Sequence, residues 1–369
     1  LYWMEDVGYY SFGADENGNK VKDKSAYSTT GIALGIFDDK RSESTIKALN
    51  QSDMVTDWGI RNLTNKSSLY YHSNYNYGAV WPFTSIFVGW AQFNQNFNLS
   101  GYNTIQSTVQ HLFENGLGLM PEVFSGDLNQ KLGEAYHNQG FSYTGYIIPI
   151  MRGLLGLEVD ANKKKITFAP KLPADWDFLE VHNIRVGENV INIECRMQNE
   201  ERRPELVEGW KVVFEMKAEI KDEIDVVFTP SLGLGSKVDK VLLNGKEIKF
   251  KEVNRSQTYL IKTEFKLIGR SEFEIKLKPA PAIYQLPIET SIGSTDKGLK
   301  IISQEFRGKS LRIKVEGLSD EVYQLGIKHY KMVKRISGAE LKGDKLFVHI
   351  PDENIKQFIE HEFVIEIAN

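Results

Sequence analysis

The stretch Leu119-Met-Pro-Glu-Val-Phe-Ser-Gly-Asp127 separates two segments whose apolar residues recur at helical spacing. Pro121 and Gly126 bound a short loop, and Glu122 is the acidic side chain at its centre. Residues 82–97 and 100–115 before the loop, and 141–157 after it, fit the helical period. The last segment is apolar on most faces, so we expect a helix enclosed by protein.

Two shorter helices are predicted upstream, at about 30–38 and 42–49, with serines as their caps. Between them and residue 82, the segment 56–78 has turn residues and many aromatics but no sustained period, which favours an ordered functional loop. Helices joined by short polar loops are typical of helical-hairpin arrays. About five helices are too few to bury these apolar faces, so we expect more of this array to precede residue 1.

From Asp160 onward the hydrophobic period changes to two, the period of half-buried strands. Asn244-Gly245 is a strong signal for a two-residue hairpin turn. Residues 279–287 contain three prolines and predict an extended linker. We therefore predict a multidomain α + β chain with a helical region at 1–158, an antiparallel β-sandwich at 159–281 and a smaller sandwich-like domain at 282–369.

The composition limits the classes of partner. The 369 residues carry a net charge of −4 without a basic run, so no nucleic acid is expected. No apolar run approaches the roughly 20 residues that cross a bilayer, so no membrane is expected either. Cys195 is the only cysteine, which excludes internal disulfides. His72 and His137 show no metal-ligand spacing, and we expect neither metal nor cofactor.

The first residues, Leu1-Tyr-Trp-Met, are neither a start methionine nor a signal peptide. An aromatic start of this kind is typical of the middle of a domain. We expect the chain to be a fragment, and the sequence predicts no cellular location.

Four blocks of the first 180 residues resemble the catalytic C-terminal half of the amylo-α-1,6-glucosidases, the glycogen-debranching type. They are Asp57-Trp-Gly-Ile-Arg-Asn-Leu63, Tyr77-Gly-Ala-Val-Trp-Pro82, Leu119-Met-Pro-Glu-Val-Phe-Ser-Gly126, and Arg152-Gly-Leu-Leu-Gly-Leu157 followed by Pro170-Lys-Leu-Pro-Ala-Asp-Trp176. That family belongs to the inverting glycosidases with an (α/α)6 barrel of six helical hairpins. The resemblance implies that residues 1–158 are the C-terminal half of such a barrel.

The resemblance also implies a function. It makes Glu122 the general base in an inverting hydrolysis of α-glycosidic, and in that family α-glucosidic, bonds. The substrate would be an oligosaccharide or polysaccharide, and no cofactor would take part. The general acid of such enzymes precedes the segment that Tyr2-Trp3 matches, so it is expected from an upstream half of the same barrel.

Further candidates follow from residue type. Glu134 is a reserve base. Trp58, Trp81, Tyr77 and Tyr143 present aromatic planes that suit the C–H faces of sugars, although core packing explains Trp58 and Trp81 equally well. Arg61 fits either sugar hydroxyls or a neighbouring carboxylate. Trp3 and Asp6 fit a substrate subsite or a purely structural role, and Asp6 also fits a displaced general acid.

Two other functions stay open. A glycoside phosphorylase on the same barrel would place a phosphate site where the hydrolase has its base. A non-catalytic glycan-binding or scaffold protein would keep the aromatic residues without the reaction.

Overall fold

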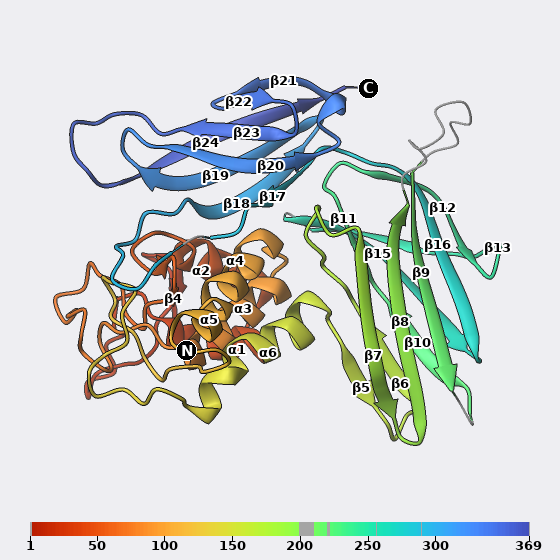
Figure 1. The fold of residues 1–369 in the computed structure, drawn as a ribbon, viewed down its shortest axis with the longest axis horizontal. Helices are drawn as coiled ribbons and strands as arrows, with labels where there is room; N and C mark the ends of the chain where they lie inside the picture. Colours follow the sequence, from red (N-terminus) through yellow and green to blue (C-terminus); the bar gives the residue numbers. More distant parts are fainter. Residues whose placement is uncertain (1, 199–209, 220–221, 256, 289, 369) are drawn as a thin grey trace.

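The computed structural model describes residues 2–198, 210–219, 222–255, 257–288 and 290–368. A helical unit (residues 2–157) lies beside two sandwiches, a first built from strands β5–β16 and a second built from β17–β24 (Figure 1). Their strands pair antiparallel except for the parallel pair β6 and β10 in the first sandwich. The prediction of a multidomain α + β fold with β-sandwich-like domains is confirmed. The division at residues 158 and 281, and the (α/α)6 barrel, stay predictions.

The helical unit is centred on α3 (Pro82–Asn94), which packs against α1, α2, α4 and α6. Pro82 occupies the first turn of α3, where its missing N–H leaves no hydrogen bond unmade. The other helices are η1 (Ala26–Ser28), α1 (Thr29–Ala33), α2 (Asp39–Leu49), α4 (Asn98–Val109), α5 (His111–Glu114), η2 (Gly140–Tyr143), α6 (Thr144–Ile148) and η3 (Pro149–Leu154). Two short hairpins complete the unit: β1 (Trp3–Met4) with β2 (Tyr9–Tyr10), and β3 (Val55–Thr56) with β4 (Gly59–Ile60).

The predicted helix at 141–157 is wrong as a single enclosed element. The chain forms a 3₁₀ turn, one short α-helix and a π-helical turn that starts at Pro149. Proline lacks an amide hydrogen and cannot continue the regular hydrogen-bond ladder. Phe141, Ile147 and Met151 are 37, 45 and 38% exposed, because no described part of the chain covers that face.

The first sandwich consists of two six-stranded sheets. One sheet has the order β11-β15-β10-β6-β5, with β14 also paired to β15, and the other has the order β13-β12-β16-β9-β8-β7. The strands are β5 (Glu158–Asp160), β6 (Lys165–Phe168), β7 (Phe178–Val186), β8 (Asn189–Gln198), β9 (Trp210–Glu219), β10 (Ile224–Phe228), β11 (Ser231–Leu232), β12 (Lys237–Leu243), β13 (Lys246–Glu247), β14 (Lys251–Arg255), β15 (Thr258–Leu267) and β16 (Arg270–Lys278).

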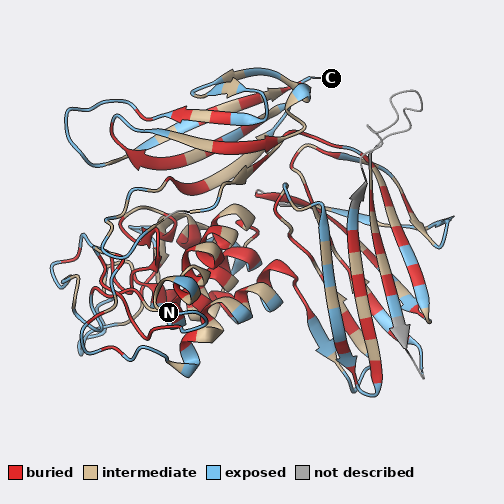
Figure 2. Ribbon diagram, viewed as in Figure 1, coloured by how far each residue is buried: buried red, intermediate tan, exposed pale blue. Residues whose placement is uncertain are grey.

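The second sandwich has two four-stranded sheets, β17-β20-β23-β22 and β18-β19-β24-β21. Its strands are β17 (Ala282–Gln285), β18 (Lys300–Arg307), β19 (Ser310–Leu318), β20 (Val322–Lys328), β21 (Val333–Ser337), β22 (Glu340–Lys342), β23 (Lys345–His349) and β24 (Phe358–Ile367), with the turn η5 (Tyr330–Met332) before β21. Buried and exposed residues alternate along many strands, as the predicted period of two requires (Figure 2). The cores of the two sandwiches form one continuous apolar cluster.

The predicted linker at 279–287 is only partly a linker. Residues 282–285 form β17, which pairs antiparallel with β20 along its whole length. Its prolines precede the strand or follow it, so none of them removes a donor from the ladder.

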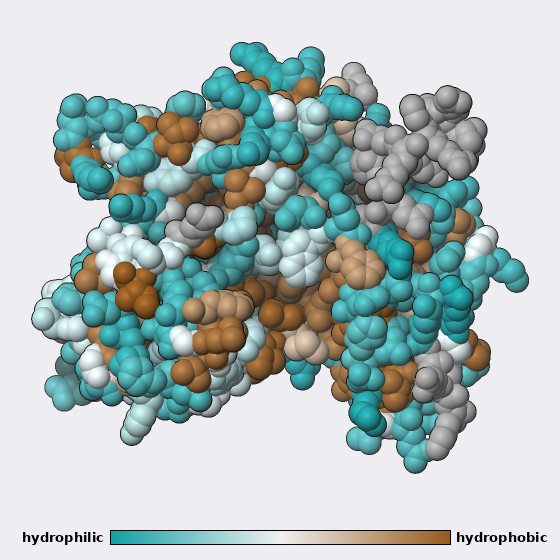
Figure 3. All heavy atoms as spheres, in the orientation of Figure 1, coloured by the Kyte–Doolittle hydropathy of each residue, from teal (hydrophilic) through white to brown (hydrophobic). Residues whose placement is uncertain are grey.

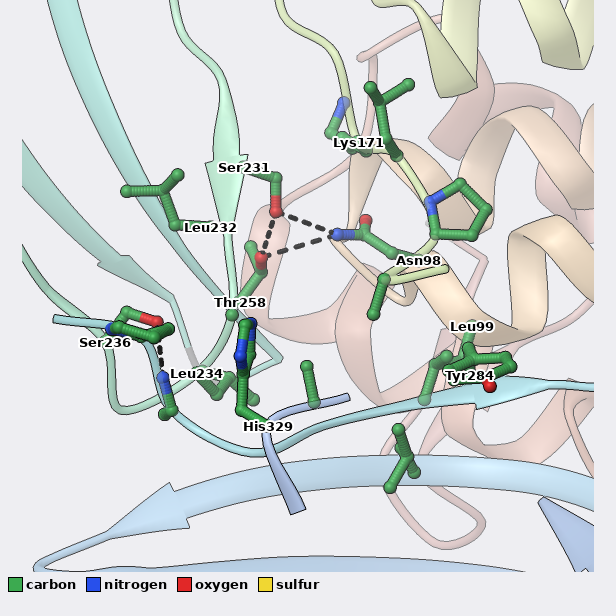
Figure 4. A pocket seen from close by; sticks show the side chains of 18 of the residues that line it. Asn98, Leu99, Lys171, Ser231, Leu232, Leu234, Ser236, Thr258, Tyr284 and His329 are labelled. Carbon is green, nitrogen blue, oxygen red and sulfur yellow. Dashed lines mark hydrogen bonds between the residues drawn. The ribbon is translucent and has the colours of Figure 1, made fainter. Parts of the chain in front are cut away.

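The three units meet around a cavity of about 140 Å³ lined mainly by apolar residues (Figure 4). Apolar side chains also gather in the middle of the face shown in Figure 3, between the helical unit and the first sandwich. At one wall of the cavity, Asn98 Nδ2 donates to Ser231 Oγ (3.2 Å) and Thr258 Oγ1 (3.3 Å). These bonds tie the start of α4 to the first sandwich.

Candidate active site

Glu122 lies on the loop between α5 and η2, and it is only 5% exposed. Its Oε1 accepts a hydrogen bond from the Tyr75 hydroxyl at 2.5 Å, and its Oε2 accepts one from the Tyr136 backbone N–H at 3.3 Å. The Glu122 backbone N–H in turn donates to the Tyr136 carbonyl at 3.0 Å. Each carboxylate oxygen therefore has one fixed donor and keeps a lone pair for a further one, such as a water molecule.

Tyr75 fixes the orientation of the Glu122 carboxylate. Partial burial, followed by the hydrogen bond to Glu122, raises the pKa of the Tyr75 phenol to about 12, so it stays a donor at neutral pH. Trp81 packs edge-on against Tyr75, with 4.4 Å between the ring centroids, and its Nε1 donates to the Tyr75 carbonyl at 2.8 Å. The tyrosine is thus held from both its backbone and its ring.

Tyr75, which contacts the carboxylate, begins a series of ring contacts that we define as the aromatic face: Tyr75, Trp81, Phe83 and Phe141. Trp81 stacks on Phe141 at 6.1 Å, and Phe141 meets Phe83 edge-on at 5.1 Å. Tyr75, Phe83 and Phe141 are between 37 and 38% exposed. A face of this kind can contact the apolar side of a sugar ring.

Two of the predicted sugar contacts are buried instead. Trp58 is 1% exposed, and its Nε1 donates to the Ser125 carbonyl at 2.8 Å. Arg61 is 3% exposed, and its Nε donates to the Gly126 carbonyl at 2.8 Å, while its Nη1 donates to the Ser52 carbonyl at 2.8 Å. Both side chains hold the backbone of the Glu122 loop, and we assign them a positioning role.

The remaining candidates divide by location. Tyr77 is 45% exposed in the loop that carries Tyr75. The Tyr143 hydroxyl lies within hydrogen-bonding distance of the Gly118 carbonyl (2.7 Å) and of Asn138 Oδ1 (2.5 Å), so it links the two ends of the Glu122 loop. Glu134 is exposed on that loop, where its charge contributes to the raised pKa of Tyr75.

Trp3 and Asp6 have partners other than Glu122. Trp3 packs against Tyr10 and beneath the Arg41 guanidinium, and Asp6 pairs with Lys22. Within the described residues, no recorded hydrogen bond, ion pair or ring contact joins either of them to Glu122. A substrate-binding role for Trp3 and Asp6 therefore stays a prediction.

Sequence reasoning missed Tyr75 and Tyr136 as hydrogen-bond donors to Glu122, and Phe83 and Phe141 as members of the aromatic face. The dense aromatic run at 70–81 was the available signal for Tyr75. The other three depend on the folding of the loop. Within the described residues, no cluster of three or more His, Cys, Asp or Glu side chains fits a metal ion, and no helix is long and apolar enough to cross a membrane.

At Gly126 the Glu122 loop lies against the loop that contains Tyr70 and Gly78. A Cβ at Gly126 would overlap the Gly78 carbonyl oxygen and the Tyr70 hydroxyl. We expect Gly126→Ala to lower the free energy of unfolding by about 1–3 kcal/mol, because the Gly78 carbonyl is fixed backbone and the Tyr70 hydroxyl is held by its hydrogen bond to Asp127. Chemical denaturation measures the change. Gly133→Ala on the same loop is the control, because its Cβ would meet nothing within 4 Å; equal losses in the two variants would contradict the close approach.

Comparisons with known proteins give matches to solved structures only; no family model and no curated protein matches the sequence. Neutral trehalase from Saccharomyces cerevisiae is 12% identical with a TM-score of 0.31, over 40% of this chain and 27% of that one. A GH127 β-arabinofuranosidase is 12% identical with a TM-score of 0.32, over 92% of this chain and 56% of that one. A GH127 β-L-arabinofuranosidase from Geobacillus stearothermophilus T6 is 7% identical with a TM-score of 0.33, over 93% of this chain and 57% of that one.

These three neighbours are glycoside hydrolases by name, and none is named as a debranching enzyme. The chain spans between about a quarter and three fifths of their lengths. At TM-scores near 0.3 the likeness assigns neither a family nor a substrate. The function proposed below rests on this chain's own residues.

Proposed function

We propose that this chain carries the general base of a glycoside hydrolase, and that Glu122 is that base. The observation that carries the proposal is the Glu122 carboxylate itself, which is 5% exposed, is held by Tyr75 and the Tyr136 amide, and keeps acceptor capacity on both oxygens. Glu122 is also the residue that the resemblance in the Pro-Glu block singles out. The sequence resemblance and the surroundings of the carboxylate therefore both favour Glu122.

The proposed reaction is an inverting hydrolysis of an α-glycosidic, and specifically an α-glucosidic, bond. In such a reaction a carboxylate removes a proton from water as the water attacks the anomeric carbon, while an acid on the other side protonates the leaving oxygen. The two carboxyl groups are about 6.5–9.5 Å apart, which leaves room for the water. Glu122 would act as the base, and the acid would come from the upstream part of the barrel that the resemblance implies.

The surroundings of Glu122 suit this role. A base must hold one orientation towards its water, and the Tyr75 hydroxyl and the Tyr136 amide restrict both oxygens. Partial exclusion of solvent strengthens the electrostatic effect of the carboxylate on the developing positive charge of the sugar. Trp81 and Tyr77 are the proposed sugar contacts among the predicted aromatics.

Hydrolysis of a panel of α- and β-linked glucosides and arabinofuranosides by the full natural chain tests the proposal. We expect turnover of α-glucosides, with the β-anomer of the released sugar appearing first in a proton NMR time course. Release of the α-anomer first would contradict inversion. Binding of the same glycans without any turnover would favour the second candidate, a non-catalytic glycan-binding protein, which the exposed aromatic face would also serve.

A further inference from the structure

A segment from the second sandwich reaches back to the Glu122 loop. Residues 290–300, here called the strap, connect β17 to β18 and run along the helical unit (Figure 1). The Gly293 N–H donates to the Asn129 carbonyl at 2.8 Å, and the Asn129 N–H donates to the Ser294 carbonyl at 2.9 Å. Leu128 and Thr295 form an antiparallel bridge beside them. The strap thus adds a short strand to the chain that follows Glu122.

The strap also holds the side chain of Asn129. Asn129 Nδ2 donates to Thr290 Oγ1 at 2.9 Å and to both carboxylate oxygens of Glu114 at 3.1 Å. Thr290 in turn donates to Gln110 Oε1 at 2.8 Å. Trp58 and Arg61 fix the loop at Ser125 and Gly126, and the strap fixes it three residues further on.

A buried charge cluster anchors the other end of the strap. Lys300 Nζ lies 2.6 Å from Asp57 Oδ1 and 2.6 Å from Asp296 Oδ1. The three side chains are 1, 8 and 7% exposed. Asp57 Oδ2 accepts from the backbone N–H groups of Lys297 and Gly298, both at 2.8 Å. Asp57 belongs to the β3–β4 turn, so the cluster joins the helical unit to the second sandwich.

The cluster has two carboxylates for one ammonium group. With both carboxylates ionised it would carry a net negative charge away from water, which is costly. Asp296 is the less favoured of the two, because its Oδ2 has no hydrogen-bond partner among the described residues. Lys300 and Arg61 favour its ionisation, but its burial has the larger opposing effect. Burial raises the pKa of Asp296 to about 7. Burial opposes ionisation of Asp57 too, but Lys300 and the two amides lower its pKa to about 2.

We propose that Asp57, Asp296 and Lys300 form a pH-sensitive latch through which the second sandwich positions the Glu122 loop. Only Asp296 of the three titrates near neutral pH, because Asp57 is held ionised and the two carboxylates raise the pKa of Lys300 despite its burial. The consequence for catalysis rests on the proposed function. The coupling between the strap and the Glu122 loop does not depend on the proposed function.

The direction of the pH effect follows from the two states of Asp296. Its pKa is about 7 in the closed latch and near the ordinary 3.8 once the strap opens to water. The closed form therefore binds the extra proton, and its stabilisation is present in full below about pH 4 and lost as the pH rises to about 7. The opening equilibrium rises by at most about tenfold per pH unit in that range and levels off above it.

Hydrogen exchange of the full natural chain at pH 5.5, 6.5, 7.5 and 8.5 tests the latch, with rates corrected for base catalysis of the chemical step. We expect the protection of the Asn129 and Gly293 amides to fall by about tenfold or more between pH 5.5 and 7.5 and then to stay constant. A constant protection across the whole series in the wild-type protein would overturn the proposal, and this measurement needs no variant.

Asp296→Asn removes the titrating proton and keeps the shape of the side chain. We expect protection in this variant to be independent of pH over the same range, and a wild-type step in the variant would also overturn the proposal. Asp177→Asn is the matched control, since Asp177 forms an exposed pair with Lys328 that joins the two sandwiches (3.0 Å, 63% and 32% exposed). It should keep the wild-type profile. These readouts require no glycosidase activity, so a failure of the proposed function leaves them intact.

Discussion

Glu122→Gln is expected to lower kcat/KM for glycoside hydrolysis by about two to four orders of magnitude, the usual contribution of a general base. Glutamine keeps the length of the side chain and can still accept the Tyr75 hydrogen bond through its amide oxygen. The amide cannot remove a proton from water. The loss should therefore fall on kcat, with KM changed much less.

Glu134→Gln is the control for this substitution, because Glu134 is exposed on the same loop. We expect it to keep the wild-type rate within about twofold, because solvent screens the effect of an exposed charge such as Glu134. If the two variants exchanged these outcomes, Glu134 would be the base. If Glu122→Gln lost hydrolysis but kept phosphorolysis with added phosphate, the chain would belong to a phosphorylase.

Lys300→Met is expected to lower the free energy of unfolding at pH 7 by about 3–5 kcal/mol, the cost of removing one partner from a buried ion pair. Methionine fills much of the volume of the lysine stem, so a packing defect contributes little. Asp57 and Asp296 would then both lose the ammonium group that lies 2.6 Å from each of them in the native protein. Urea denaturation of the full chain measures the loss.

Lys314→Met provides the comparison for Lys300→Met. Lys314 pairs with Glu360 in the same sandwich, but the two side chains are 41 and 47% exposed. Exposed pairs contribute about 0–1 kcal/mol, so this variant should be close to the wild-type protein. Losses of similar size in the two variants would mean that the buried cluster adds no more than an ordinary surface pair.

The sequence predicts local features of this molecule well. The Pro- and Gly-bounded loop, the start of a helix at Pro82 and the alternation of the strands all depend on neighbours within a few residues. Asn244 and Gly245 form the expected hairpin turn, with φ of 52° and 75°, values that these residue types tolerate.

The parts that could not be predicted depend on contacts between distant residues. Trp58 and Arg61 lie beside turns, where side chains are often exposed. Both are buried because they donate hydrogen bonds to the carbonyls of Ser125 and Gly126, which lie about 65 residues further along the chain. The strap contacts the Glu122 loop across more than 160 residues of chain. Asp57 and Lys300 show no pattern in the sequence that would pair them, because ion pairs over such separations are set by the fold alone.

The strand β17 has a practical consequence for dissecting this protein. A truncation placed at the proline-rich segment 279–287 would look safe from the sequence, yet it would remove the edge strand of one sheet and detach the strap. Shortened versions ending there would keep Glu122 but lose the bridge at Leu128. The last sandwich is therefore part of the architecture of the candidate site, and recombinant versions intended for assay should include it.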